Sequence, residues 1–220
     1  MIVLLFGATG LAGSGVLRAC LDSPAVTEVR ALVRRSTGVH HPKLREIVHA
    51  DYLDYSAVAG EFAGVDACYF CLGVSVSQVP DEAAYRRIHQ AFPIAAATVL
   101  RSRSPAAQFH YLSGGRAGVK SRWMWARVKG EAERDLMAEF SATCWRPAMI
   151  DGHQVANQPA LTNFLRPVLR AVFKPFRGMY VWNDDIGRAM LQATKQGIKN
   201  RIIENAELRD LADAERASAG

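Results

Sequence analysis

Short apolar runs alternate with segments of helical periodicity along most of the chain. The runs that predict strands are residues 1–6, Glu28–Val33, 44–49, 66–72, Gln108–Leu112, Thr143–Arg146 and 201–204. Helices are predicted at residues 11–21, 82–102 and 125–140, and Pro93 is expected to kink the second of them. Strands this apolar are typical of a parallel sheet that helices cover on both faces. The pattern therefore predicts an α/β fold with a doubly wound parallel sheet, the three-layer Rossmann arrangement.

A chain of 220 residues is expected to build one core, so we predict a single domain over residues 1–220. Residues 151–182 depart from the alternation of strands and helices, and we expect this segment to shape the substrate cleft. Within it, residues 161–176 have the spacing of a basic amphipathic helix, which is interpreted as packing over the cleft. Binding to a membrane surface, a lid over the cofactor and a contact between subunits stay open as alternatives.

The composition is that of an ordinary globular protein, with 50% hydrophobic and 22% charged residues. The formal net charge is +6, but the arginines are scattered, and no basic run indicates nucleic-acid binding. No stretch approaches the ~20 apolar residues that a membrane span needs. The expected partner is therefore a small molecule, and the sequence leaves a homo-oligomer open.

The cysteines and histidines predict neither disulfides nor a metal site. Three of the four cysteines lie in apolar segments, which is typical of buried thiols in a reducing compartment, so a cytoplasmic protein is expected. Cys68 and Cys71 have redox spacing, but they lie on a predicted strand and are interpreted as packed side chains. His40 and His41 have no carboxylate or cysteine at ligand spacing, so no metal is expected.

The first predicted strand leads into a glycine-rich turn, which then opens a helix. Its first glycine permits the tight turn, the second lets the backbone approach a pyrophosphate, and the third lets the helix pack close to the strand. The first amides of the helix then face the anion. We therefore predict a dinucleotide site that includes Gly7, Thr9, Gly10, Leu11, Ala12 and Gly13.

The end of the second strand indicates which dinucleotide is bound. An acidic residue there would bind the ribose 2′-hydroxyl of NAD and repel a 2′-phosphate. This chain has Arg34 and Arg35 instead, and two guanidinium groups offer the charge and the forked donors that suit a phosphate. The sequence favours NADP over NAD, while two merely solvated arginines remain the alternative.

Several stretches resemble the atypical short-chain dehydrogenase/reductase superfamily. They are LLFGATGLAGSGVLRACL, YFCLG, YLSGG, WARVKGEAE, WRPAMIDG and DDIGRAML, in that order along the chain. Within the superfamily, the chain is most similar to the Tat-interacting-protein-like oxidoreductases and to NAD-dependent epimerase/dehydratase-like proteins. The resemblance implies further cofactor contacts at Asp51, Tyr52, Cys71, Leu72, Gly73, Lys129, Arg146, Pro147 and Ala148.

The resemblance also implies a catalytic set, which this chain carries only in part. Ser113 matches the serine that polarises a substrate carbonyl or hydroxyl, and Lys129 matches the lysine that binds the nicotinamide ribose. The tyrosine expected four residues before Lys129 is replaced by Trp125. An indole N–H does not titrate usefully, so Trp125 cannot act as a general acid. The proton is left to an unidentified group or to water, and the weaker candidates for supplying it are Tyr85, His89, His110 and Tyr111.

Two functions follow from this pattern. The leading hypothesis is an NADP(H)-dependent oxidoreductase that acts on a small carbonyl or alcohol, with Ser113 orienting the substrate and Lys129 the cofactor. The alternative is a catalytically silent NADP(H)-binding protein that senses redox state or regulates a partner. Trp125 favours the alternative without deciding between them.

Overall fold

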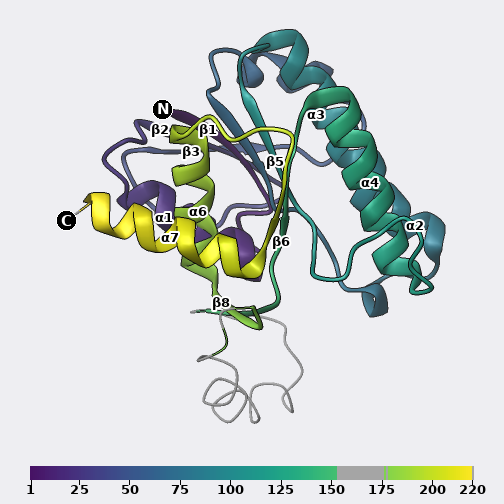
Figure 1. Ribbon diagram of the computed structural model, residues 1–220. Helices are drawn as coiled ribbons and strands as arrows, with labels where there is room; N and C mark the ends of the chain where they lie inside the picture. The colour runs from purple at the N-terminus through teal and green to yellow at the C-terminus, as the bar shows by residue number, and fades with distance from the viewer. Residues whose placement is uncertain (153–175, 177, 220) are drawn as a thin grey trace.

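A parallel β-sheet forms the centre of the molecule. The computed structural model describes residues 1–152, 176 and 178–219. Within these residues, seven parallel strands pair in the order β3-β2-β1-β4-β5-β6-β9 (Figure 1). Their bounds are β1 Ile2–Phe6, β2 Glu28–Val33, β3 Leu44–Val48, β4 Ala67–Phe70, β5 Gln108–Leu112, β6 Thr143–Arg146 and β9 Ile202–Glu204. The doubly wound parallel sheet predicted from the apolar runs is confirmed.

Helices cover both faces of the sheet, which makes three layers (Figure 1). One face carries α1 Leu11–Asp22, α6 Asn183–Lys195 and α7 Asn205–Ala219. The other carries α3 Phe92–Arg103, α4 Met124–Phe140 and the 3₁₀ segment η1 Ser56–Phe62. Strands β7 Met149–Asp151 and β8 Tyr180–Trp182 pair with each other in a separate small sheet.

Alternate side chains of each strand build two cores, one on each face of the sheet. On β1, Val3 and Leu5 pack under α1 and α6, whereas Leu4 and Phe6 face α3 and α4. All four are fully buried, and each contributes roughly 1.5–3 kcal/mol to folding. Burial on both faces explains why the strands are apolar without interruption.

The segment predicted as one helix over residues 82–102 is divided into three. These are α2 Glu82–Arg86, the π-helical turn η3 Arg87–Ala91 and α3. Pro93 stands in the first turn of α3 and has no N–H, so the carbonyl of His89 cannot receive its usual helical bond. The Tyr111 hydroxyl donates to that carbonyl instead, at 2.8 Å. The interruption therefore lies one turn before the proline.

The structure differs most from the sequence-based prediction in the segment 151–182 and in the C-terminal helices. The prediction of an amphipathic helix over residues 161–176 lies outside the described residues except for Phe176, which is exposed. Strands β7 and β8 and helix α7 were not predicted, and α6 was expected only from the family resemblance. Among the described residues, no helix has the length and apolarity needed to cross a membrane.

Helices α1 and α6 approach so closely that side chains are excluded between them. A Cβ on Gly15 would lie 2.4 Å from the backbone carbon of Asn183. A Cβ on Gly187 would lie 2.6 Å from the Cβ of Ala19. The buried Asn183 side chain donates to the carbonyl of Leu11 at 2.8 Å. This contact fixes the orientation of the helix that begins at the glycine-rich turn.

We predict that Gly15→Ala lowers the free energy of unfolding by about 2 kcal/mol, because overpacking the α1–α6 contact outweighs the higher helix propensity of alanine. The matched control is Gly60→Ala, since a Cβ at Gly60 meets nothing within 4 Å. Urea denaturation measures both variants. Equal midpoints for the two variants would contradict the packing argument.

Candidate functional site

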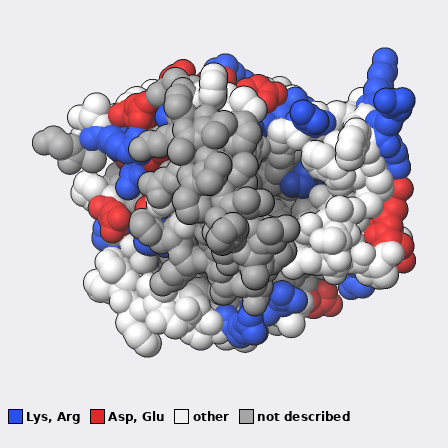
Figure 2. Space-filling view, turned by 90° about the horizontal axis from the view of Figure 1, so that it is seen from below, with Lys and Arg blue, Asp and Glu red and all other residues white. Residues whose placement is uncertain are grey.

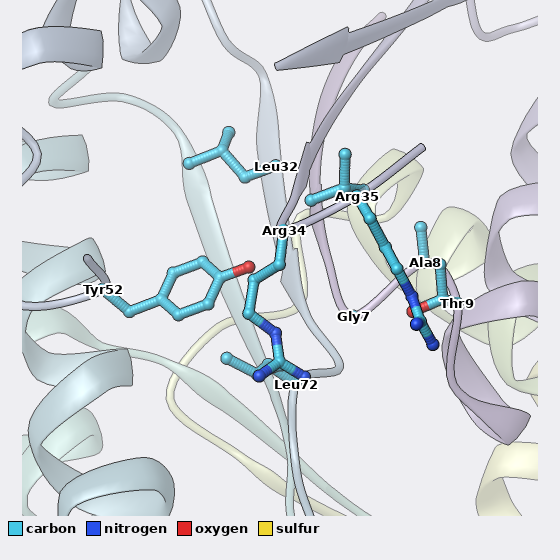
Figure 3. Close-up of a pocket in the computed structure, with 9 residues that line it drawn as sticks. Gly7, Ala8, Thr9, Leu32, Arg34, Arg35, Tyr52 and Leu72 are labelled. Atoms are coloured by element: carbon cyan, nitrogen blue, oxygen red, sulfur yellow. The ribbon is translucent and has the colours of Figure 1, made fainter. Parts of the chain in front are cut away.

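A cavity of about 350 Å³ lies where β1, β2 and β4 end. These strands are parallel, so their carboxyl ends, and the loops that follow them, share one edge of the sheet. The cavity is lined by Gly7, Ala8, Thr9, Leu32, Val33, Arg34, Arg35, Tyr52 and Leu72 (Figure 3). None of these residues is acidic. The cavity thus combines an apolar floor with two cationic side chains.

The glycine-rich turn is shaped by close backbone approaches. Gly7 has φ +78°, and a Cβ on it would lie 2.6 Å from the backbone carbon of Cys71. A Cβ on Gly13 would lie 2.0 Å from the carbonyl oxygen of Gly7. Gly10 donates its N–H to that same carbonyl at 2.9 Å. The three glycines therefore let β1, β4 and α1 meet at one point, which no side chain could occupy.

The N-terminus of α1 presents unfilled hydrogen-bond donors at the turn. Gly10 is the N-cap residue, and it has no side chain that could accept from the first helical amides. The first turn of the helix also contains no acidic residue. The partial positive charge of the helix end is thus left without a compensating side chain, which favours an anion beside it.

Arg34 and Arg35 directly follow β2, and both line the cavity. In Figure 3 the Arg34 side chain lies on the side of Tyr52 and Leu72, the Arg35 side chain lies on the side of Thr9, and the Tyr52 hydroxyl points toward Arg34. Burial raises the pKa of Tyr52, and the Arg34 charge acts in the opposite direction. Both arginines are exposed, and among the described residues neither has an ion-pair partner. Two cations are therefore available to a ligand in this cavity.

The loop that follows these arginines is held by Glu46 of β3. Its carboxylate accepts from the Ser36 hydroxyl at 2.6 Å and from the Thr37 N–H at 2.7 Å, and it also contacts the Thr37 hydroxyl. These hydrogen bonds join the Glu46 carboxylate to the loop that follows Arg35. Glu46 is a residue that sequence reasoning missed, because no local pattern relates it to a loop ten positions earlier.

Ser113 and Lys129 come together beyond the end of β5. Lys129 lies on α4, and its ammonium group donates to the carbonyl of Ser113 at 2.7 Å. The Ser113 residue is buried, and its hydroxyl has no hydrogen-bond partner among the described residues. Burial lowers the pKa of Lys129 to about 8, and the carboxylate of Glu133 acts in the opposite direction. The predicted pair is thus assembled with a free, buried hydroxyl.

His89 lies behind the loop that follows β4. The side chain is 2% exposed, and a Cβ on Gly73 would lie 2.9 Å from its Cε1. Its Nε2 lies 3.1 Å from the carbonyl of Val74, whereas its Nδ1 is buried without a partner among the described residues. Burial and then the charge of Lys129 lower the pKa of His89 to about 3. The imidazole is therefore neutral at physiological pH.

Arg146, Pro147 and Ala148 lie beside the Ser113 loop, but their polar groups have partners. The carbonyl of Pro147 accepts from Gly115 N–H at 3.0 Å. The N–H of Ala148 donates to the Asn205 side chain at 2.8 Å. The Arg146 guanidinium donates to both carboxylate oxygens of Glu133, at 3.0 and 2.6 Å, and this pairing raises its pKa. The Arg146 side chain is therefore already paired, and only the backbone of this residue is available for a cofactor contact.

The remaining predicted residues occupy different parts of this edge. Tyr52 and Leu72 line the cavity, and Cys71 packs its backbone against Gly7. Asp51 is exposed, and its carboxylate accepts from the N–H of Leu53 at 3.0 Å. Trp125 is half-buried in the first turn of α4, one turn before Lys129. Two lining residues, Leu32 and Val33, were missed because apolar strand ends carry no motif, whereas Ala8 lies within the predicted turn.

The family is decided by a match to a family model. The model described as NAD dependent epimerase/dehydratase family matches residues 3–117, which is more than half of the chain. The chain belongs to this family. The matched residues include the glycine-rich turn, the two arginines and Ser113. The predicted membership of the short-chain dehydrogenase/reductase superfamily is confirmed.

Curated relatives align with this chain over nearly its whole length. "Protein FMP52, mitochondrial" of Eremothecium gossypii is 28% identical, and the alignment covers 98% of this chain and 99% of the relative. "Protein fmp52, mitochondrial" of Emericella nidulans is 24% identical over 93% of this chain and 92% of the relative. Both names give a mitochondrial location, so the prediction of a cytoplasmic protein is wrong. All four cysteines are buried, and a thiol hidden in a core does not report the compartment.

Solved structures share the fold at low sequence identity. DesIV, a dTDP-glucose 4,6-dehydratase from Streptomyces venezuelae solved with NAD and TYD bound, has a TM-score of 0.70 and 17% identity, covering 99% of this chain and 81% of that one. An oxidoreductase of the short-chain dehydrogenase/reductase family from Burkholderia thailandensis has a TM-score of 0.68 and 16% identity, covering 91% of this chain and 89% of that one. The fold is thus the NAD(P)-binding Rossmann fold of oxidoreductase-like proteins.

We predict that Glu133→Gln lowers the free energy of unfolding by about 3 kcal/mol, because it leaves the Arg146 cation beside a buried neutral amide. The Glu133 side chain is 3% exposed. The matched control is Glu204→Gln, which removes the other carboxylate on Arg146. The Glu204 side chain is 60% exposed, so the expected loss is under about 1 kcal/mol.

Thermal and urea denaturation of these two variants measure the difference. An equal loss of unfolding free energy in both variants would contradict the argument that burial of the carboxylate decides how much its pairing with Arg146 stabilises the fold.

Proposed function

We propose that this protein binds NADP(H) along the carboxyl edge of the sheet and uses it to reduce or oxidise a small carbonyl or alcohol. The observation that carries the proposal is the cavity between the glycine-rich turn and the two arginines. It is about 350 Å³ in volume, has no acidic residue in its lining, and opens at the N-terminus of α1. The proposal treats the chain as one dinucleotide-binding domain in which residues 151–182 shape the substrate cleft.

The site fits a dinucleotide at both ends of the cavity. The backbone of Gly7, Gly10 and Gly13 forms a cradle that a Cβ would fill, which suits a pyrophosphate near the first amides of α1. In the proposed arrangement, Leu32 and Leu72 contact the apolar faces of the adenosine. Tyr52 lies beside it. These residues bind and orient the group without taking part in the reaction.

Arg34 and Arg35 support a preference for NADP over NAD. Neither guanidinium is neutralised by a carboxylate among the described residues, so both are free to bind a 2′-phosphate. Glu46 keeps the following loop in place by accepting from Ser36 and Thr37. The solved neighbours with NAD in their descriptions show that the fold itself also accepts NAD, so the preference rests on these side chains.

The chemical half of the proposal rests on Ser113 and Lys129. When bound, the nicotinamide supplies or accepts a hydride. The buried Ser113 hydroxyl, which has no partner among the described residues, is suited to holding the substrate oxygen. Lys129 is kept in place by the carbonyl of the same serine and is suited to the nicotinamide ribose. Pro147 and Ala148 border the site through the contact of Pro147 with Gly115.

A catalytically silent NADP(H)-binding protein is the second candidate function, and Trp125 is the observation that favours it. The indole stands one helical turn before Lys129, where the superfamily resemblance implies a proton-donating tyrosine. A regulator would need the cofactor cavity but not the proton.

We predict that Arg34→Ala raises the dissociation constant of NADPH by about tenfold or more, because a charged hydrogen bond to the phosphate is worth roughly 1.5–3 kcal/mol. The affinity for NADH should stay within twofold, since NADH has no 2′-phosphate. Fluorescence titration of both nucleotides measures this, with the exposed Arg103→Ala as the control. Equal affinities of the unmodified protein for NADPH and NADH would contradict the preference for NADP.

Turnover separates the two candidate functions. The oxidoreductase is expected to oxidise bound NADPH with at least one member of a panel of small aldehydes, ketones and quinones, and Ser113→Ala should slow that reaction by about 100-fold or more. Absorbance at 340 nm follows the reaction. Tight NADPH binding with no oxidation by the whole panel would favour the silent protein.

A further inference from the structure

The site needs a group that can deliver a proton, and Trp125 cannot provide it. Reduction of a carbonyl adds a hydride to carbon and a proton to oxygen, so a donor must stand near Ser113. The described groups at this edge with protons to transfer are Tyr85, His89, Tyr111 and Lys129. Their surroundings differ enough to identify the donor.

Burial disqualifies three of these four groups. Burial, followed by the Lys129 charge, lowers the pKa of His89 to about 3, so at neutral pH this imidazole is neutral and lacks the acidic imidazolium proton. Burial raises the pKa of Tyr111 well above its usual value, and its hydroxyl already donates to the carbonyl of His89. Burial raises the pKa of Tyr85 to about 12, and its ring stacks on that of His89 at 4.1 Å.

Lys129 is held where a donor is needed. Its ammonium lies 2.7 Å from the carbonyl of Ser113, the residue whose own hydroxyl is buried and free. Gly114, the next residue of the loop, borders the ammonium, since a Cβ there would lie 3.4 Å from Nζ. Among the described residues Lys129 has no ion-pair partner. Its proton is therefore not committed to a carboxylate.

The groups around Lys129 keep its charge poorly compensated. Glu133 follows one turn later on α4, but both of its carboxylate oxygens accept from Arg146 of β6. From η3 the facing group is His89, which is neutral. From β5 it is the Ser113 carbonyl, which carries no net charge. Burial then lowers the pKa of Lys129 to about 8, with Glu133 opposing, so both protonation states are within reach near neutrality.

We propose that the Lys129 ammonium is the proton donor of the reduction, acting on a substrate oxygen that the Ser113 hydroxyl holds. This role rests on the proposed oxidoreductase function. The carbonyl carbon gains a hydride from the dinucleotide and its oxygen gains a proton from Nζ. The products are an alcohol, the oxidised dinucleotide and a neutral lysine, which regains its proton from water. In the reverse direction the neutral amine accepts the proton of the alcohol.

Two measurements test this role, and the first does not depend on activity. Protein labelled with ¹³C at the lysine Cε is titrated by NMR, and the Lys129 resonance is assigned by its loss in Lys129→Arg. We expect one resonance with a midpoint near pH 8. The control is Lys199→Arg, which should retain this resonance because Lys199 is exposed at the opposite edge of the sheet. A midpoint near 10.5 for Lys129 would overturn the role.

The second measurement is the pH profile of NADPH-dependent reduction. The donor must be protonated, so kcat/KM should be constant below pH 8 and fall about tenfold per pH unit above it. Lys129→Arg keeps the positive charge but cannot release a proton, so reduction at saturating NADPH should fall by about 100-fold or more. Reduction that survives in Lys129→Arg with an unchanged pH profile would overturn the proton-donor role of Lys129 and leave the proposed oxidoreductase function standing.

Two other outcomes would contradict the proposed oxidoreductase function, and the proton-donor role of Lys129 would fall with it. Both are observed on the unmodified protein, so they are distinguishable from failure of the role of Lys129. One is an unmodified protein that does not bind NADPH. The other is an unmodified protein that binds NADPH but reduces no member of the carbonyl panel.

Discussion

The contact between the Gly7 carbonyl and helix α1 is the constraint on which the site depends. A Cβ at position 13 would lie 2.0 Å from that carbonyl oxygen, and a Cβ at position 7 would lie 2.6 Å from the backbone that follows β4. Only a chain without side chains at both positions can bring two strand ends and a helix N-terminus together. Asn183 and Gly15 then hold α1 against α6, so the helix end points at the cavity. The fold thereby presents a helix N-terminus that favours an anion before any charged side chain contributes.

Charge divides the carboxyl edge into two regions with different chemistry. Around the cavity, Arg34 and Arg35 remain exposed and unpaired among the described residues, which suits a phosphate that arrives from solution. Beyond β5, burial governs Lys129 and His89 and lowers the pKa of both. Seen from this edge, Lys and Arg side chains lie at separate places around the rim with Asp and Glu between them (Figure 2). The Lys and Arg side chains visible in this view thus do not form one basic surface.

The sequence predicted the parts of the fold that depend on local periodicity. Strands β2, β5 and β6 have the predicted bounds, and the glycine spacing located the cavity, because backbone constraints are encoded at fixed intervals. The π-helical turn was not predictable, since it depends on Tyr111 satisfying a carbonyl that Pro93 leaves free. Glu46 and the ion pair of Glu133 with Arg146 were missed for a similar reason. Each joins neighbouring elements of the chain that share no local sequence pattern, so only the folded arrangement shows that their side chains meet.

The central claim is that one dinucleotide lies along this edge, with its 2′-phosphate at the end of β2. A crystal structure of the protein with NADPH tests it most directly. The account predicts the pyrophosphate over the amides at the start of α1, the 2′-phosphate within hydrogen-bond distance of Arg34 or Arg35, and the nicotinamide beside Ser113 and Lys129. A nucleotide bound elsewhere, or a 2′-phosphate that points into solvent away from both arginines, would contradict it.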